Sequence, residues 1–149
     1  MTGSIMNDQP RRQIGPHQGR EAELLLKGEK PVALFSAPCL NHQPDQIQRL
    51  EQAVEHGLLC KAFMSSAIAD RTFYCLPQAQ MQMRELMAIY QRLDSQTPPD
   101  ATEMTISLED HRRIGTLLGY APEDIEVFLE QERLRAQARQ AQQVHPVMR

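Results

Sequence analysis

Four cysteine and histidine residues have a spacing close to that of a structural zinc site. Two residues separate Cys39 from His42, three separate His56 from Cys60, and thirteen lie between the two pairs. Thiolate sulfur and imidazole nitrogen are the usual ligands of such sites. The site would require the loop with Cys39 to fold onto the end of a predicted helix over 45–56. More simply, His56 suits the C-terminal end of that helix, where the dipole favours it, and Cys60 suits a buried strand position. We therefore expect no metal or other cofactor, and a metal site at these four residues stays an alternative.

Cys39 also has the best surroundings of the three thiols for nucleophilic catalysis. It follows a predicted strand, and His42 is close enough in sequence to act as a base for the thiol. However, no glycine-rich elbow surrounds Cys39, and no serine-centred elbow occurs elsewhere. The seven glycines are scattered singly, so the sequence lacks a phosphate-binding loop. We therefore expect a non-enzymatic protein, with a small thiol protein centred on Cys39 and His42 as an alternative.

The stretch HRRIGTLLGYAPEDIEVFLEQER, residues 111–133, predicts a helix, a tight turn at Gly119 and a second helix. A DNA-binding helix-turn-helix has the same order, and its second helix enters the major groove. Here that helix would bring five carboxylates towards the DNA phosphates, which electrostatics opposes. These are Glu123, Asp124, Glu126, Glu130 and Glu132. Acidic residues in a first helical turn also stabilise the helix dipole. We therefore interpret the stretch as a scaffold hairpin and keep a DNA-binding regulator as an alternative.

Two surface features favour binding to another protein. Arg133, Arg135 and Arg139 make the end of the last predicted helix basic, as in an arm that docks on an acidic partner or on its own copy. For these arginines, the simpler alternative is solvation of a helix end. Met81 lies off the apolar stripe of its helix, and a flexible exposed methionine suits an adaptable binding surface.

Length, charge and cysteine content limit the class of protein. A chain of 149 residues can form one domain without metal or disulfide bonds. The formal charge is −3 and no third of the chain is strongly basic, so we expect no nucleic-acid partner. The odd number of cysteines, three, indicates free thiols in a reducing compartment. The first sixteen residues lack the apolar region of a signal peptide, and the apolar runs are too short to cross a bilayer. We expect a cytoplasmic protein with no membrane partner.

Apolar periodicity and the placement of proline and glycine predict the secondary structure. The predicted elements are a helix over 18–27, a strand over 32–35, a helix over 45–56, strands over 58–64 and 71–76, a helix over 78–95, a helix starting after Ser107, and a helix from Pro122 to about 142. The stretch 58–76 reads as a hairpin. Ser107, with Asp110 three residues later, has the pattern of a capping box. Beyond Glu132 the apolar stripe is lost, which predicts a solvated extension that frays near Val144.

This order of elements predicts an α+β fold. A small sheet of about three strands would pack against amphipathic helices, largely on one face, and a C-terminal helical hairpin would carry a polar helical extension. The domain would span 18–142, with flexible tails over 1–17 and 143–149. From these patterns we expect a protein-binding or regulatory protein that acts through its helical surface, with homodimerisation through the last helix as one form of binding.

Overall fold

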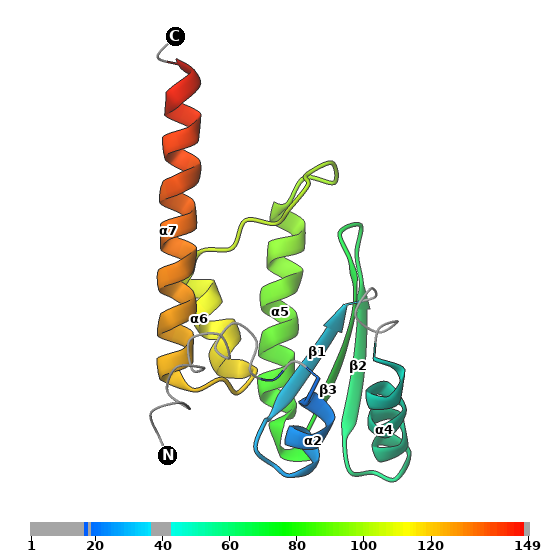
Figure 1. Ribbon diagram of the computed structural model, residues 1–149. Helices are drawn as coiled ribbons and strands as arrows, with labels where there is room; N and C mark the ends of the chain where they lie inside the picture. The colour runs from blue at the N-terminus through cyan, green and yellow to red at the C-terminus, as the bar shows by residue number, and fades with distance from the viewer. Residues whose placement is uncertain (1–16, 18, 37–42, 148–149) are drawn as a thin grey trace, which may run out of the picture.

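The chain folds into a three-stranded antiparallel sheet with helices on both faces, as seen in a computed structural model (Figure 1). The structure describes residues 17, 19–36 and 43–147, and the side chains of the last helix as far as 142. The strands are β1 (Val32–Ser36), β2 (Cys60–Ser65) and β3 (Asp70–Cys75). The helices are α2 (Glu21–Leu26), α4 (Pro44–Glu55), the short 3-10 helix η1 (Pro77–Ala79), α5 (Gln80–Gln96), α6 (Leu108–Leu117) and α7 (Pro122–Val147). The predicted α+β class is therefore confirmed.

Local signals in the sequence set several helix boundaries. Pro44 and Pro122 each occupy the first position of their helices, where a missing N–H costs nothing. The Ser107 hydroxyl accepts a hydrogen bond of 3.0 Å from the backbone N–H of Asp110, so the predicted cap of α6 is confirmed. These signals act through a few neighbouring residues, and for that reason they can be identified in the sequence.

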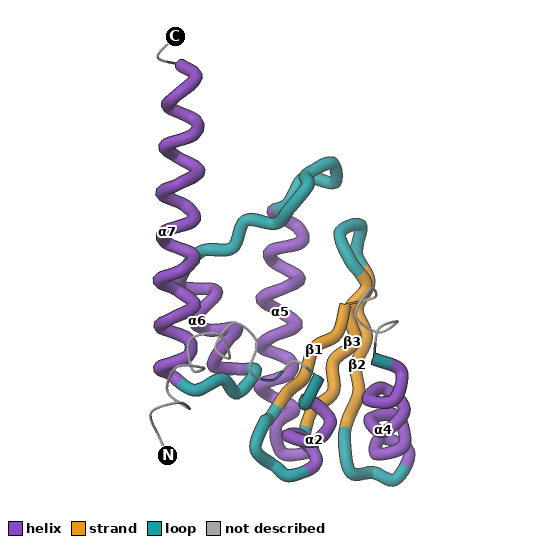
Figure 2. The backbone as a smooth tube through the Cα atoms, in the orientation of Figure 1, coloured by secondary structure: helices purple, strands orange, loops and turns teal. Residues whose placement is uncertain are grey.

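The expectation that helices would cover largely one face of the sheet is wrong. The strand order is β1-β3-β2, so β3 is central, and all but the first of its residues are buried. One face, with Val32 and Phe73, packs against α5 and α6. The other face, with Phe35 and Tyr74, packs against α2 and α4 (Figure 2). Successive residues of a strand point to opposite faces of the sheet, and β1 and β3 carry apolar residues on both faces. Each face therefore needs helices that bury it.

A buried ion pair joins the sheet to α5. Arg71 of β3 donates a hydrogen bond to Asp94 of α5 at 2.7 Å, and each side chain is only 7% exposed. The guanidinium also lies over the ring of Tyr90, 4.5 Å from its centroid. The second carboxylate oxygen of Asp94, Oδ1, is buried without a hydrogen-bond partner. The hydrogen bond between Arg71 and Asp94 therefore has to offset most of the loss of hydration of the two charges.

Helix α7 begins as part of the fold and then leaves it. Ile125 and Leu129 are buried in the contact with α6, whereas every residue from 133 to 142 is exposed. Figure 1 shows this later half rising beyond the other helices. The helix runs to Val147, slightly past the expected fraying point at Val144. Although α7 is long, none of the helices in the described ranges combines enough length with enough apolar character to cross a membrane.

Candidate functional site

The projecting half of α7, residues 133–142, is here called the arm. It contains Arg133, Arg135 and Arg139, all exposed, together with Leu134, whose side chain is 54% exposed. Arg133 pairs with Glu130, and Arg135 pairs with Glu132, in both cases three residues back along the same helix. Surface pairs of this kind contribute little free energy, so the arginines can exchange these partners for others at low cost.

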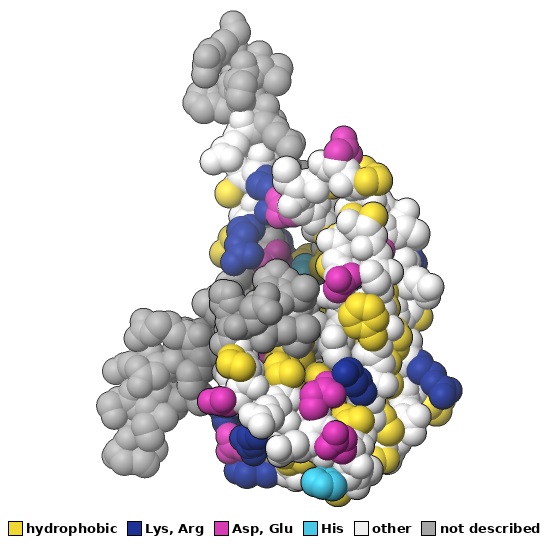
Figure 3. Space-filling view, turned by 90° about the vertical axis from the view of Figure 1, so that its right-hand side faces the viewer, with side chains coloured by type: hydrophobic (Ala, Val, Ile, Leu, Met, Phe, Trp, Pro, Cys, Tyr) yellow, Lys and Arg dark blue, Asp and Glu magenta, His cyan; other side chains and the backbone are white. Residues whose placement is uncertain are grey.

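The arm is basic and the rest of the chain is acidic. Residues 133–142 contain three arginines and no Asp or Glu. Because the whole chain has a formal charge of −3, the remainder carries −6. Dark blue basic side chains lie along the column formed by α7, with some acidic groups beside them, and the body of the molecule also carries both kinds of charge (Figure 3). The charge is therefore divided between two parts of the molecule, which favours contacts between the arm and an acidic surface.

Met81, the other predicted binding residue, does not join the arm. Its side chain is 80% exposed in the first turn of α5. That end of α5 lies beside the sheet, at the opposite end of the molecule from the arm (Figure 1). A partner that contacts the arm would therefore not reach Met81 across a short continuous surface.

The hairpin of α6 and α7 packs as a scaffold at the base of the arm. Ile114 and Leu117 of α6 are buried, as are Ile125 and Leu129 of α7. Glu123 is exposed and Asp124 is half-buried, at the N-terminal end of α7. The apolar residues that resemble a helix-turn-helix pattern thus pack in the interior of the protein.

The structure describes only part of the alternative zinc site. Cys39 and His42 lie outside the described residues. His56 is exposed at the end of α4, while Cys60 is half-buried against the core on the α5 side of the sheet. Within the described ranges, no three Cys, His, Asp or Glu side chains come together as metal ligands would. The zinc alternative therefore gains no support from His56 or Cys60.

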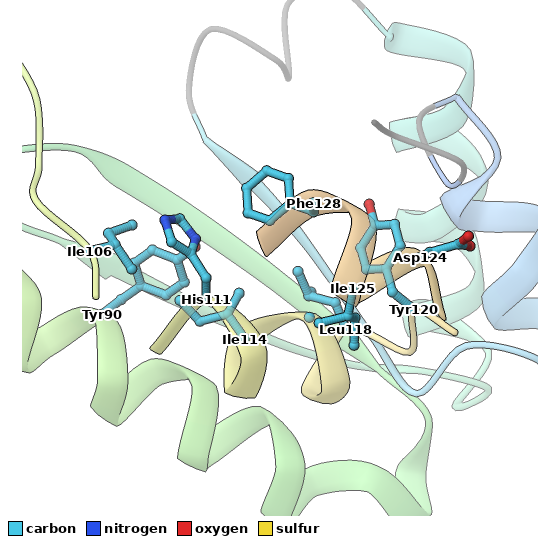
Figure 4. Close-up of a pocket in the computed structure, with 10 residues that line it drawn as sticks. Tyr90, Ile106, His111, Ile114, Leu118, Tyr120, Asp124, Ile125 and Phe128 are labelled. Atoms are coloured by element: carbon cyan, nitrogen blue, oxygen red, sulfur yellow. The ribbon is translucent and has the colours of Figure 1, made fainter. Parts of the chain in front are cut away.

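A small apolar pocket lies where α5, α6 and the first half of α7 meet. It has a volume of about 260 Å³, slightly smaller than typical small-molecule sites of about 300–1,000 Å³. Figure 4 shows Tyr90 and His111 at one end and Tyr120 and Asp124 at the other. The apolar wall is formed mainly by Ile106, Ile114, Leu118, Ile125 and Phe128. The pocket is therefore suited to an apolar group rather than to a charged ligand.

His111 is the titratable group best placed in this pocket. The centroids of the His111 and Phe128 rings lie 5.0 Å apart, with the ring planes at 72°, and Nε2 of His111 lies 3.9 Å from a carboxylate oxygen of Glu132. Burial lowers the pKa of His111, although Glu132 and Asp110 oppose the change. The imidazole is therefore neutral at pH 7 and offers one donor and one acceptor to the pocket. The residues that line the pocket include no serine, threonine or cysteine that could act with it as a nucleophile.

A second polar cluster surrounds Lys30, which is only 2% exposed. Its ammonium group donates to the backbone oxygen of Leu118 at 2.5 Å and lies 2.8 Å from Nδ1 of His17. His17 in turn stacks on Tyr120, with ring centroids 4.0 Å apart. Burial lowers the pKa of Lys30 to about 7. The contact with Leu118 satisfies a backbone oxygen at the C-terminal end of α6, so we interpret Lys30 as a structural tie between that helix and the start of β1.

The lowered pKa of His17 predicts that the free energy of unfolding depends measurably on pH. Burial, with Lys30 and Arg20 nearby, lowers its pKa from 6.5 to about 4. Between those values the unfolded chain binds the proton and the folded chain does not, so stability is lost as the pH falls from about 6.5 to 4. The pKa of Lys30, about 7, makes stability rise again above neutral pH, by the same sign rule.

We expect His17→Phe, which keeps a ring on Tyr120, to flatten the acid part of this profile by about 1–2 kcal/mol, allowing for partial solvation of the imidazole. Urea unfolding at pH 4.5 and 7 measures the effect, and His56→Phe at the exposed end of α4 is the control. An unchanged profile in His17→Phe would show that its ring is equally hydrated in both states.

The pocket and the Lys30 cluster were not identified from the sequence. Both depend on residues brought together from three or more separate elements, and no local spacing marks them. A single lysine between Glu29 and Pro31 would be expected to be exposed, because lysine is rarely buried.

Comparison with known proteins finds no matching family model, no matching curated protein and no matching solved structure. The function is therefore inferred from the chain's own residues.

Proposed function

We propose that the protein is a non-enzymatic binding protein whose arm docks on an acidic surface of another protein. The observation that carries the proposal is the division of charge between the exposed arm and the rest of the chain. The arm holds three exposed arginines and no acid, and the rest of the chain has a net charge of −6. Arginine suits such contacts because its planar guanidinium forms two parallel hydrogen bonds with a carboxylate.

The exposure of the arm supports a role outside the fold. Helix α7 has 26 residues and would be about 39 Å long, but between residues 122 and 142 only its first turns bury side chains. A helix that is not packed gains little stability from its own sequence. The arm therefore contributes little to the core, and a partner that covers Leu134 and pairs with the arginines would give it a packed face.

An acidic protein fits the charges better than DNA. The base of the arm carries Glu126, Glu130 and Glu132 within the same helix, so the phosphates of a rigid DNA duplex that lies along the helix axis would meet these carboxylates. A folded acidic surface can present its carboxylates to the arm alone. Pairing with a second copy through the arms would place arginines opposite arginines along much of the interface, which is unfavourable. We therefore propose another protein rather than a dimer formed by two arms.

Reversing two charges in the arm tests the proposal. We expect Arg135→Glu combined with Arg139→Glu to weaken binding to polyglutamate at least tenfold at low salt, because two attractive contacts become repulsive. The control is Arg49→Glu with Arg84→Glu, two exposed arginines on α4 and α5, which changes the net charge equally. Fluorescence anisotropy measures both affinities. Equal weakening in the two variants would show that net charge alone drives binding and would contradict a specific arm.

Cross-linking in the source cells identifies what the arm contacts. A photoreactive residue replaces Leu134 in the arm, and the control replaces Leu58, which has a similar exposure of 57% between α4 and β2. We expect Leu134 alone to give cross-links, to peptides of another protein that are rich in Asp and Glu. Cross-links from Leu134 to the same chain, to nucleic acid or to nothing would each overturn the proposal.

A further inference from the structure

Two free cysteines face each other across the β2–β3 hairpin. Cys60 is the first residue of β2, Cys75 is the last residue of β3, and the antiparallel register pairs them directly. Directly opposed residues have side chains on the same face of a sheet. Both cysteines accordingly pack on the α5 side, Cys75 fully buried and Cys60 half-buried. The hairpin thus holds two thiols close together without a disulfide bond between them.

The pairing satisfies the backbone requirements of a disulfide. Opposed residues of an antiparallel pair have Cα atoms about 4.5–5.5 Å apart. Disulfides span Cα separations of about 4.4–6.8 Å. The Cα separation typical of such a pair therefore falls within the range that a disulfide spans, and closure requires both side chains to rotate towards each other. On its other side, Cys75 pairs with Val32 of β1, which is apolar and has no thiol that could compete with Cys60.

We propose that Cys60 and Cys75 form a reversible cross-strand disulfide by exchange with a small-molecule disulfide such as glutathione disulfide. Cys60 lies on the edge strand and is the more exposed thiol, so it reacts first. Its thiolate attacks one glutathione sulfur, forms a mixed disulfide and releases the other glutathione as a thiolate. The sulfur of Cys75 then loses its proton, attacks the Cys60 sulfur and expels the second glutathione. The two cysteines lose two electrons and two protons, which reduce the small disulfide to two thiols.

The buried position of Cys75 sets the rate of closure. Burial raises the pKa of Cys75 to about 11, and the adjacent Cys60 adds to the rise. At neutral pH Cys75 is therefore a thiol, and the second step waits for its deprotonation. Below that pKa, the rate of ring closure is expected to rise about tenfold per pH unit, because the thiolate fraction rises tenfold.

The test uses the full chain with Cys39→Ser, so that only the paired thiols remain. After incubation with excess glutathione disulfide in native buffer, we expect the intact mass to fall by two hydrogens and both free thiols to disappear. The closed hairpin should unfold at a higher temperature than the reduced chain. Cys75→Ser in the same background should stop at a glutathione adduct on Cys60, which confirms the order of the two steps.

Three outcomes would overturn the proposal. The first is retention of both thiols under conditions in which a small thiol control is oxidised. The second is a stable glutathione adduct on Cys60 while Cys75 remains a free thiol. The third is disulfide formation only after urea is added, which would show that the folded hairpin holds the sulfurs apart. The proposal is independent of the arm, since neither cysteine lies on α7.

Discussion

Arg71→Met should lower the free energy of unfolding by about 3–5 kcal/mol, the largest effect expected from any single substitution considered for this chain. The substitution leaves the carboxylate of Asp94 without its cation. That carboxylate is only 7% exposed, and its Oδ1 atom already lacks a partner. The guanidinium is also lost from the face of Tyr90. Urea unfolding at neutral pH measures the change.

Two controls separate charge burial from general loss of packing. Arg71→Met combined with Asp94→Leu removes both charges, and we expect stability to return to within about 1–2 kcal/mol of the original chain. Lys61→Met breaks an ion pair with Glu51 in which both side chains are about 40% exposed, so its effect should stay below about 1 kcal/mol. If the double variant is as unstable as Arg71→Met, the effect comes from packing around Arg71 and not from the unpaired carboxylate.

Gly119→Ala should lower the free energy of unfolding by about 2–4 kcal/mol. Gly119 lies in the turn between α6 and α7 with φ of +89°, a conformation that costs other residues about 1–2 kcal/mol. A Cβ atom at this position would also lie 2.6 Å from Cδ of Pro31, which is too close for two carbon atoms. The turn must approach the start of β1 this closely for Lys30 to reach the backbone oxygen of Leu118.

Gly57→Ala isolates the conformational part of this effect. Gly57 has a similar φ of +74°, and a Cβ atom there would meet nothing within 4 Å. We expect this variant to lose only about 1–2 kcal/mol. In a Pro31→Ala background, Gly119→Ala should cost no more than Gly57→Ala. If Gly119→Ala costs the same in both backgrounds, the ring of Pro31 is not the source of the additional loss.

Residue patterns alone predicted the elements of this fold well, because each element carries local signals. The run VALF predicted β1, Ser107 and Asp110 marked the start of α6, and Pro122 marked that of α7. The layer arrangement was missed, although β3 contained a usable clue. Its last three residues, Phe73, Tyr74 and Cys75, are apolar at consecutive positions, as expected for a strand buried on both faces.

The candidate sites differ in how much local information they carry. The basic character of the arm follows from Arg133, Arg135 and Arg139, so the sequence identifies it without the fold. The pairing of Cys60 with Cys75 could also have been found, because a hairpin with a loop between residues 64 and 71 already places them opposite each other. The burial of Lys30 could not, since it depends on Leu118, 88 residues further along the chain.

The most direct test of the proposed arm is the affinity of a chain that lacks residues 133–142 for polyglutamate, with urea unfolding as the check on its fold. Residues from 133 to 142 are all exposed, so their removal should change the free energy of unfolding by less than about 0.5 kcal/mol. The account predicts that this folded, shortened chain loses the binding shown by the full chain. Binding that survives the deletion would contradict the account, because the acidic surface would then be recognised elsewhere on the molecule.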